Sequence, residues 1–255
     1  MKTALVTGAA RGIGLATAKR FLAEGWRVLM LDRLEETLRE AHRALASNAA
    51  HVVVADVSDP DQAARALREA EALAGGLDAL VNNAGVGEFR AAGETDYALW
   101  REIMATNLDG PFLMTTAALP LLARDGGGAV VNVGSISGLR ASTLRTAYGT
   151  SKAALVHLTK QHAAELGEVG VRVNLVAPGP VETAMAAKVH TPAIRRGYRD
   201  AIPLKRYGEE AEIAAAIVWL AGPEASYVTG QTLAVDGGFD ATGIGLPALR
   251  GENDG

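Results

Sequence analysis

Two side chains suited to proton transfer lie four residues apart in the sequence. Tyr148 and Lys152 fall within Thr146–Leu166, a segment with helical spacing, so one helix would place both on the same face. A tyrosine has a pKa of about 10, too high for a base at neutral pH, but a neighbouring ammonium group favours the phenolate. The spacing also arises by accident on many helices. Together the two residues predict an acid–base pair acting on one ligand.

A serine supports this interpretation. Ser135 follows Ala129–Val133, an apolar segment that we expect to be a strand. Ligands of open α/β sheets bind at the carboxyl ends of the strands, so the hydroxyl would lie where a substrate binds. We expect Ser135 to hydrogen-bond a substrate oxygen beside Tyr148.

A glycine-rich turn follows the first apolar segment, Thr3–Thr7. Its sequence is Thr7-Gly8-Ala9-Ala10-Arg11-Gly12-Ile13-Gly14, and a helical pattern comes next. Glycines at such a junction let the backbone approach a pyrophosphate, which the N–H groups of the helix N-terminus then bind. The glycine spacing differs from the usual G-x-G-x-x-G, and glycines are also common in plain turns. The position on the first strand–helix turn favours a dinucleotide site.

Acidic residues end the next two apolar segments. Asp32 comes 18 residues after Gly14, where a carboxylate accepts hydrogen bonds from the adenosine ribose. Asp56, before Val57, has two readings: a neighbour of the adenine, or a turn residue that caps a helix.

Short apolar segments alternate with helical patterns along almost the whole chain. Because the apolar segments lack polar alternation, we expect strands buried on both faces, as in a parallel sheet covered by helices. The succession predicts a single-domain, doubly wound α/β fold with right-handed crossovers. The predicted strands are Thr3–Thr7, Arg27–Leu31, His51–Ala55, Ala79–Asn82, Ala129–Val133, Val171–Val176 and Thr232–Val235, and the predicted helices include Ile13–Glu24, Leu34–Ala46 and Pro60–Ala74.

Two segments interrupt this rhythm. Residues of about 182–207 are polar and rich in arginine, and we expect either a solvated loop or a mobile lid over a site. The glycine-rich end of the chain is either a loop or a tail that caps a subunit. We therefore predict one domain over residues 1–238, including the lid, and a tail over 239–255.

Composition excludes several classes of protein. The 255 residues are 49% hydrophobic with a formal net charge of −4, which argues against nucleic-acid binding. No apolar run approaches the ~18 residues of a membrane span, and the N-terminus does not resemble a signal peptide, so we expect a cytoplasmic protein. There is no cysteine, and the five histidines are scattered, so no metal site is expected.

In these motifs the chain resembles the short-chain dehydrogenase/reductase family over essentially residues 3–238. The glycine turn, Asn82-Asn83-Ala84-Gly85, Asn107, the Ser135–Tyr148–Lys152 set and Pro178-Gly179-Pro180-Val181-Glu182-Thr183 match in order, as do Tyr227-Val228-Thr229-Gly230-Gln231 and Val235-Asp236-Gly237-Gly238.

The resemblance implies a Rossmann-like fold and hydride transfer between a nicotinamide and a secondary alcohol or ketone. Tyr148 would be the acid–base group, Lys152 would lower its pKa and bind the ribose, Ser135 would orient the oxygen, and Asn107 would complete a proton relay through a water. The implied cofactor contacts are Gly8, Arg11, Gly12, Ile13, Gly14, Asp32, Asp56, Val57, Asn83, Ala84, Gly85, Tyr148, Lys152, Pro178, Gly179, Val181 and Thr183.

Cofactor and substrate preferences are less strongly specified. Asp32 favours NAD, whereas Arg11 and Arg33 could bind the 2′-phosphate of NADP. Arg145 suits an anionic group such as the carboxylate of a hydroxy acid, as in 3-hydroxybutyrate dehydrogenases, unless it points outward or pairs with an acid. A neutral polyol or sugar is then the leading substrate class. Further predicted substrate contacts are Ser137, Arg140, His190 and Arg199.

Other hypotheses differ in class. Epimerases and dehydratases of this fold usually need a longer C-terminal domain, and a non-catalytic nucleotide-binding module is expected to lack part of the Asn-Ser-Tyr-Lys set. The family resemblance also implies a homo-oligomer, with a tetramer favoured, and Pro111–Leu122 and Ala153–Leu158 are apolar around most of their circumference.

Overall fold

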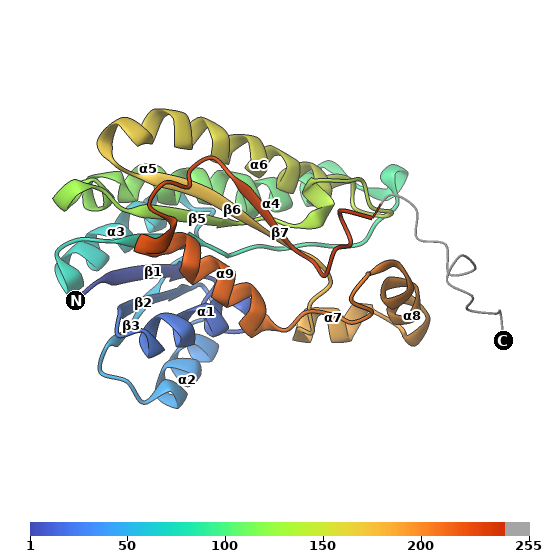
Figure 1. Cartoon of the computed structure of the whole chain (residues 1–255), viewed down its shortest axis with the longest axis horizontal. Coiled ribbons are helices and arrows are strands. Elements are labelled where there is room, and N and C mark those ends of the chain that lie inside the picture. The colour runs from blue at the N-terminus through green and yellow to red at the C-terminus, as the bar shows by residue number, and fades with distance from the viewer. Residues whose placement is uncertain (243–255) are drawn as a thin grey trace.

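A parallel sheet of seven strands forms the centre of the molecule (Figure 1). The computed structural model describes residues 1–242, apart from the side chains of residues 125, 184, 185 and 188. The strand order is β3-β2-β1-β4-β5-β6-β7, so the order reverses between β1 and β4. The strands are β1 (Thr3–Thr7), β2 (Arg27–Asp32), β3 (Ala50–Val54), β4 (Ala79–Asn82), β5 (Ala129–Val133), β6 (Arg172–Pro178) and β7 (Thr232–Val235).

Helices cover both faces of this sheet. Helices α1, α2 and α9 lie on one face, and α3, α4, α5 and α6 lie on the other (Figure 1). Their bounds are α1 (Gly12–Ala23), α2 (Glu35–Leu45), α3 (Pro60–Ala74), α4 (Tyr97–Met104), α5 (Gly110–Leu122), α6 (Thr146–Leu166) and α9 (Glu210–Ala221), and α7 (Ala184–Val189) and α8 (Pro192–Ala201) lie beside the carboxyl edge.

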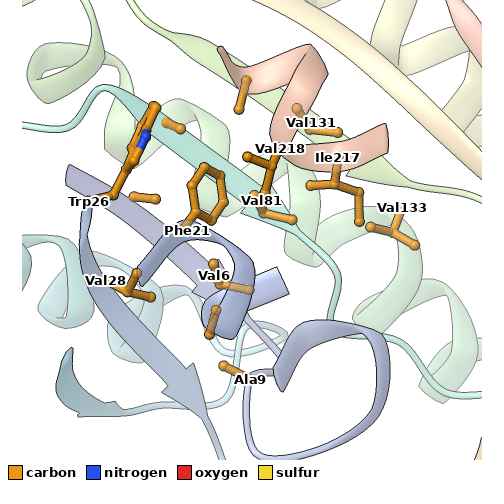
Figure 2. Close-up of a cluster of buried hydrophobic side chains, with 14 of the residues drawn as sticks. Val6, Ala9, Phe21, Trp26, Val28, Val81, Val131, Val133, Ile217 and Val218 are labelled. Atoms are coloured by element: carbon orange, nitrogen blue, oxygen red, sulfur yellow. The ribbon is translucent and has the colours of Figure 1, made fainter. Parts of the chain in front are cut away.

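The core is divided by the sheet into two apolar layers. In the layer under α1 and α9, Phe21 and Ile217 pack on valines of the central strands (Figure 2). Phe21 also contacts Trp26, with 4.8 Å between the ring centroids. Every residue of β1, β4 and β5 is buried, as expected for strands covered on both faces.

The predicted doubly wound α/β fold is confirmed, and all seven predicted strands are present. Four have the predicted bounds, and β6 runs two residues farther, to Pro178. Neither reading of residues 182–207 included regular structure, yet this segment forms α7 and α8. Thr183 and Thr191 cap these helices by accepting hydrogen bonds from Ala186 N and Ile194 N, and Pro192 occupies a first-turn position. Most of the predicted tail, residues 243–255, lies outside the described residues.

Candidate active site

A cleft of about 620 Å³ opens at the carboxyl ends of the strands, where the strand order reverses. Such switch points are where α/β sheets bind ligands. Most of the predicted site residues line it: Gly8, Arg11, Gly12, Ile13, Asp32, Asp56, Val57, Asn83, Ala84, Gly85, Ser135, Ser137, Arg145, Tyr148, Lys152, Pro178, Gly179, Val181, Thr183 and His190.

The glycine turn forms the phosphate end of this cleft. Gly8 and Gly12 have φ values of +66° and +63°, which favour glycine. Gly14 does not line the cleft: a Cβ there would lie 2.1 Å from the Gly8 carbonyl oxygen, so it allows α1 to pack on the turn. Asn83 fixes the turn by donating from Nδ2 to the Thr7 carbonyl at 2.9 Å. The N–H groups of the first turn of α1 thus face a space suited to a pyrophosphate.

A carboxylate is held at the adenosine end. Asp32 accepts hydrogen bonds from Ala10 N at 3.1 Å and from Leu34 N at 3.0 Å, which fixes its side chain at the end of β2. Arg33 forms an ion pair with Asp56 at 3.0 Å. Burial tends to raise the pKa of Asp56, but hydrogen bonds from Ser58 and Arg33 outweigh this effect and lower it. These donors and acceptors fit a dinucleotide cofactor along the cleft.

Tyr148 lies at the other end of the cleft, beside Ser135 and Arg145. Burial raises the pKa of the phenol, while a hydrogen bond with Ser135 and the charge of Arg145 act in the opposite direction. The Arg145 guanidinium carbon lies 5.1 Å from the Tyr148 ring centroid, and Lys152 Nζ lies 5.9 Å from it. Two cations therefore lie close to the phenol ring, and the charge of Arg145 opposes burial, although burial dominates and the pKa of Tyr148 is raised overall.

Lys152 is buried beneath the cleft. Its ammonium group donates to the Val133 carbonyl at 2.8 Å, and burial lowers its pKa to about 8. A Cβ placed on Gly85 would lie 3.5 Å from Lys152 Nζ and 3.3 Å from Asn107 Oδ1, so both groups border the same small space. A side chain at Gly85 would therefore fill the space between them.

Asn107 lies behind the cleft lining, in a π-helical turn. The turn, Ala105–Asp109, joins α4 to α5 and holds one extra residue, a feature that often marks functional sites. The buried amide accepts from Val86 N at 2.8 Å and donates to Val86 O at 2.9 Å. Its second donor bond goes to Ser151 on α6. Asn107 thus ties the segment that follows β4 to α6, the helix that carries Tyr148 and Lys152, and its predicted relay role stays a prediction.

A buried amide network ties the central strands to the helices behind them. Asn82 Nδ2 donates to Asn132 Oδ1 at 2.9 Å and to Thr115 on α5, and Asn132 donates to Thr159 on α6. These bonds join β4 and β5 just before their carboxyl ends. The network therefore steadies the edge that carries the cleft.

The sequence interpretation missed Gly87. A Cβ at this position would lie 2.9 Å from Tyr148 Cδ2, so only glycine lets the tyrosine ring lie against this backbone. The requirement arises from a contact between segments 61 residues apart, and no local pattern around Gly87 indicates it.

Aromatic rings and one cation surround the cleft beyond Tyr148. The Arg145 guanidinium lies over Phe89, 3.5 Å from the ring centroid. His190 packs against Tyr198 with 5.3 Å between ring centroids, and its Nδ1 lies 3.0 Å from the Tyr207 hydroxyl. Burial, Arg145 and Arg195 lower the pKa of His190. Phe89 and Tyr198 were not predicted, because they come from a loop and from a helix that the sequence pattern did not indicate.

Two predicted substrate contacts lie elsewhere. Arg140 does not line the cleft, because its guanidinium binds main-chain carbonyls of Phe239 and Thr242. Arg199 lies on the exposed side of α8 and does not line the cleft either.

Residues 1–242 contain neither a cluster of metal-ligating side chains nor a membrane-spanning helix. In this range no three His, Cys, Asp or Glu side chains gather as metal ligands would. No helix within it has the length and apolar character needed to cross a membrane.

A parallel sheet with a phosphate-binding turn at one end of its cleft and a phenol–ammonium pair at the other is the arrangement of a nicotinamide-dependent oxidoreductase. Residues 8–240 match the family described as Enoyl-(Acyl carrier protein) reductase. The chain belongs to the short-chain dehydrogenase/reductase family, and it is an oxidoreductase that transfers a hydride between a nicotinamide cofactor and a secondary alcohol or ketone.

Named relatives span almost the whole chain. Galactitol 2-dehydrogenase (L-tagatose-forming) of Cereibacter sphaeroides is 44% identical, over 92% of this chain and 94% of the relative. 2-(R)-hydroxypropyl-CoM dehydrogenase of Xanthobacter autotrophicus is 40% identical, over 94% and 99%. The solved structure of a glucose/ribitol dehydrogenase of the short-chain dehydrogenase/reductase type from Brucella melitensis has a TM-score of 0.89 at 35% identity, covering 93% of this chain and 96% of that chain.

Proposed function

We propose that the chain is an NAD-dependent dehydrogenase of small polar secondary alcohols, with Tyr148 as its acid–base group. The observation that carries this proposal is the Tyr148 phenol in the cleft, with Ser135 beside it and two cations close to its ring. When bound, the nicotinamide exchanges a hydride with the carbon that bears the oxygen.

The chain's own residues would handle the proton and the oxygen. Tyr148 takes the hydroxyl proton during oxidation and returns it during reduction, while Ser135 holds the oxygen by a hydrogen bond. The positive charge of Lys152 favours the phenolate. The proton then leaves the cleft through the space beside Gly85, which Lys152 and Asn107 border.

Cofactor preference is the first test. Asp32 would face a 2′-phosphate, and like charges ~4 Å apart repel by about 4 kcal/mol at an effective dielectric near 20. Arg33 is paired with Asp56 at 3.0 Å, which leaves Arg11 as the opposing cation. We expect kcat/KM to favour NAD over NADP, and Asp32→Ala to shift the ratio toward NADP by about tenfold or more. A wild-type ratio in favour of NADP would show that the arginines determine the preference.

The substrate class is the second test. Arg145 lines the cleft beside Tyr148 and, within residues 1–242, forms no ion pair with a carboxylate. We propose that it binds the carboxylate of a hydroxy acid, because a guanidinium offers two parallel donors. Arg145→Ala is then expected to cost about 1.5–3 kcal/mol in kcat/KM for hydroxy acids.

A matched panel separates this proposal from its alternative. Small hydroxy acids, polyols and simple alcohols are assayed with NAD and both proteins. The galactitol dehydrogenase relative supports a neutral polyol, which Ser137, His190 and Tyr198 could hold by hydrogen bonds. The neutral substrates also control for the effect of Arg145 on Tyr148. Equal losses for acids and polyols would reject the carboxylate site.

We also propose a cytoplasmic homo-oligomer, with a tetramer favoured. Phe112 on α5 is 48% exposed and stacks near His162 of α6, so the outer side of this helix pair offers an apolar contact. Light scattering of the purified protein measures the oligomeric state.

A further inference from the structure

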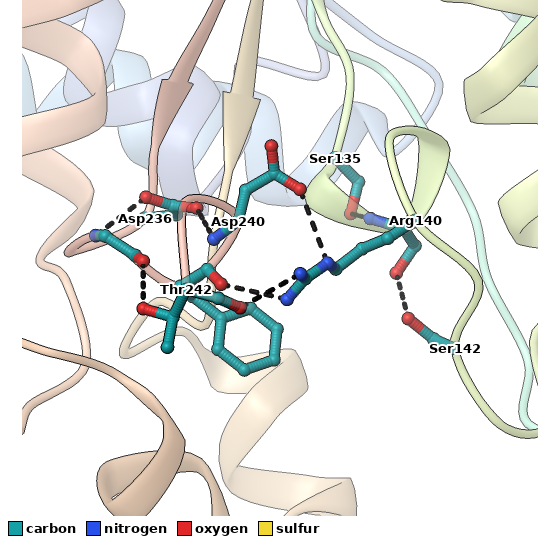
Figure 3. Close-up of polar contacts among 9 residues, drawn as sticks. Ser135, Arg140, Ser142, Asp236, Asp240 and Thr242 are labelled. Carbon is teal, nitrogen blue, oxygen red and sulfur yellow. Dashed lines mark hydrogen bonds and ion pairs between the residues drawn. The ribbon is translucent and has the colours of Figure 1, made fainter. Parts of the chain in front are cut away.

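Arg140 joins two distant parts of the chain at the substrate end of the molecule (Figure 3). Its guanidinium donates to Phe239 O at 2.9 Å and to Thr242 O at 3.2 Å, and it lies 3.5 Å from an Asp240 carboxylate oxygen. The guanidinium carbon also lies 5.4 Å from the Phe239 ring centroid. Residues 236–242, here called the C-terminal turn, are therefore held by one side chain.

Hydrogen bonds within the C-terminal turn make it a folded unit. Asp236 accepts from Gly238 N at 2.9 Å and from Asp240 N at 2.6 Å, and Thr242 Oγ1 donates to Gly238 O at 2.9 Å (Figure 3). Gly237 and Gly238 both have positive φ values, +67° and +89°. Fixing one part of this unit therefore fixes the main chain that carries Phe239, and the Phe239 ring itself contacts the Arg140 guanidinium.

The Phe239 ring reaches the wall of the cleft through α8. It meets Tyr198 edge to face, with 5.9 Å between centroids, and Tyr198 in turn packs on His190. A side chamber of about 400 Å³ lies between Arg140, Phe239 and the cleft. Phe89, Arg145 and Tyr198 line both the chamber and the cleft, so these residues separate them.

The other end of this connection is the loop that carries Ser135. Ser135 Oγ accepts from Ser137 N at 3.1 Å, and Arg140 N donates to Ile136 O at 3.0 Å. A Cβ at Gly138 would lie 2.6 Å from the Lys152 main chain, so this loop lies directly on the catalytic helix. Arg140 thus belongs to the loop that carries Ser135 and packs on α6. Its side chain holds the C-terminal turn, which in turn contacts α8 through Phe239.

We propose that Arg140 is a positioning residue: by holding Phe239 against Tyr198 it fixes α8 over the substrate end of the cleft and so sets the affinity for the substrate. This inference rests on the proposed dehydrogenase function. Arg140 touches neither the reacting atoms nor the cofactor end, so its loss is expected to act on substrate binding alone.

The test replaces Arg140 by glutamine in the full chain. A misplacement of about 1 Å can cost 10²-fold, and we expect a rise of about tenfold in KM for the best alcohol. We expect kcat and the Kd for NAD to change by less than about threefold. Hydrogen exchange of residues 192–201 is expected to become faster, a readout that needs no turnover.

Arg172→Gln is the matched control. Arg172 also donates to main-chain carbonyls, those of Leu220, Ala221, Gly222 and Val228, but it lies away from the cleft. We expect this variant to lower the Tm and leave KM unchanged. Phe239→Ala should reproduce the KM effect of Arg140→Gln, and the double variant should add little to either.

Three results would overturn the inference: an unchanged KM in Arg140→Gln, equal KM changes in both arginine variants, or additive effects of Arg140→Gln and Phe239→Ala. If the wild type oxidises no alcohol, the proposed function fails instead. Hydrogen exchange of α8 in Arg140→Gln then still decides whether Arg140 holds this helix.

Discussion

Tyr148→Phe is expected to abolish turnover while leaving cofactor binding nearly intact. The ring and its packing against Gly87 persist, and only the hydroxyl that transfers the proton is lost. Loss of general acid–base help typically removes about 10²–10⁴ in rate, and the loss is larger if the hydroxyl also orients the substrate. The Kd for NAD, followed by quenching of protein fluorescence, should stay within about threefold of the wild-type value.

Tyr97→Phe is the matched control, because Tyr97 is 75% exposed and lies outside the cleft. It should keep full activity. A Tyr148→Phe variant with near-normal kcat would end the proposed mechanism, because Tyr148 is the phenol that hydrogen-bonds Ser135.

Lys152→Met is expected to reduce kcat by about 10² or more, because Tyr148 loses a cation that favours its phenolate. The variant should also change how stability depends on pH. The pKa of Lys152 is lowered from 10.5 to about 8 in the folded chain, which corresponds to about 3 kcal/mol.

The sign follows from proton binding. Between pH 8 and 10.5 the unfolded chain holds the lysine proton and the folded chain has lost it, so the free energy of unfolding rises with pH. Below pH 8 the folded chain bears the full cost of a buried charge. The wild type without cofactor should therefore gain about 3 kcal/mol across this window relative to Lys152→Met. Urea unfolding of the wild type and of Lys152→Met, at pH 7 and above pH 10, measures the change in the free energy of unfolding of each protein. Parallel pH profiles of the two proteins would contradict the lowered pKa of Lys152.

The sheet and the helix that carries Tyr148 and Lys152 follow from local sequence. Buried parallel strands need continuous apolar segments, and Thr3–Thr7 and Ala129–Val133 are such segments, so both could be identified as strands of a parallel sheet. The proposed cofactor contacts follow for the same reason, since strand ends in a parallel sheet share one edge. Asp32 and Ser135 could be assigned to that edge from the sequence alone.

The substrate end could not be assigned in this way. Its walls come from a loop at Phe89, from α8 and from the C-terminal turn, and their positions depend on contacts between distant segments. An arginine such as Arg140 has the same local signature whether it meets a substrate or a main-chain carbonyl. Only the partner, 99 residues farther along the chain, decides between the two.

The π-helical turn at Ala105–Asp109 has a consequence for insertions and deletions in this part of the chain. An α-helix has 3.6 residues per turn, so one residue more or less rotates all that follows by about 100°. The extra residue lets Asn107 face Val86 while α5 still turns Met114 and Ala118 into the core. Removal of one residue here would leave a continuous regular helix. Either the Asn107 amide would then turn away from Val86, or the apolar face of α5 would turn away from the core. Substitutions at solvent-facing positions of this segment are therefore far easier to tolerate than the loss of a single residue, and a sequence alignment that opens a one-residue gap here marks a chain without this amide contact.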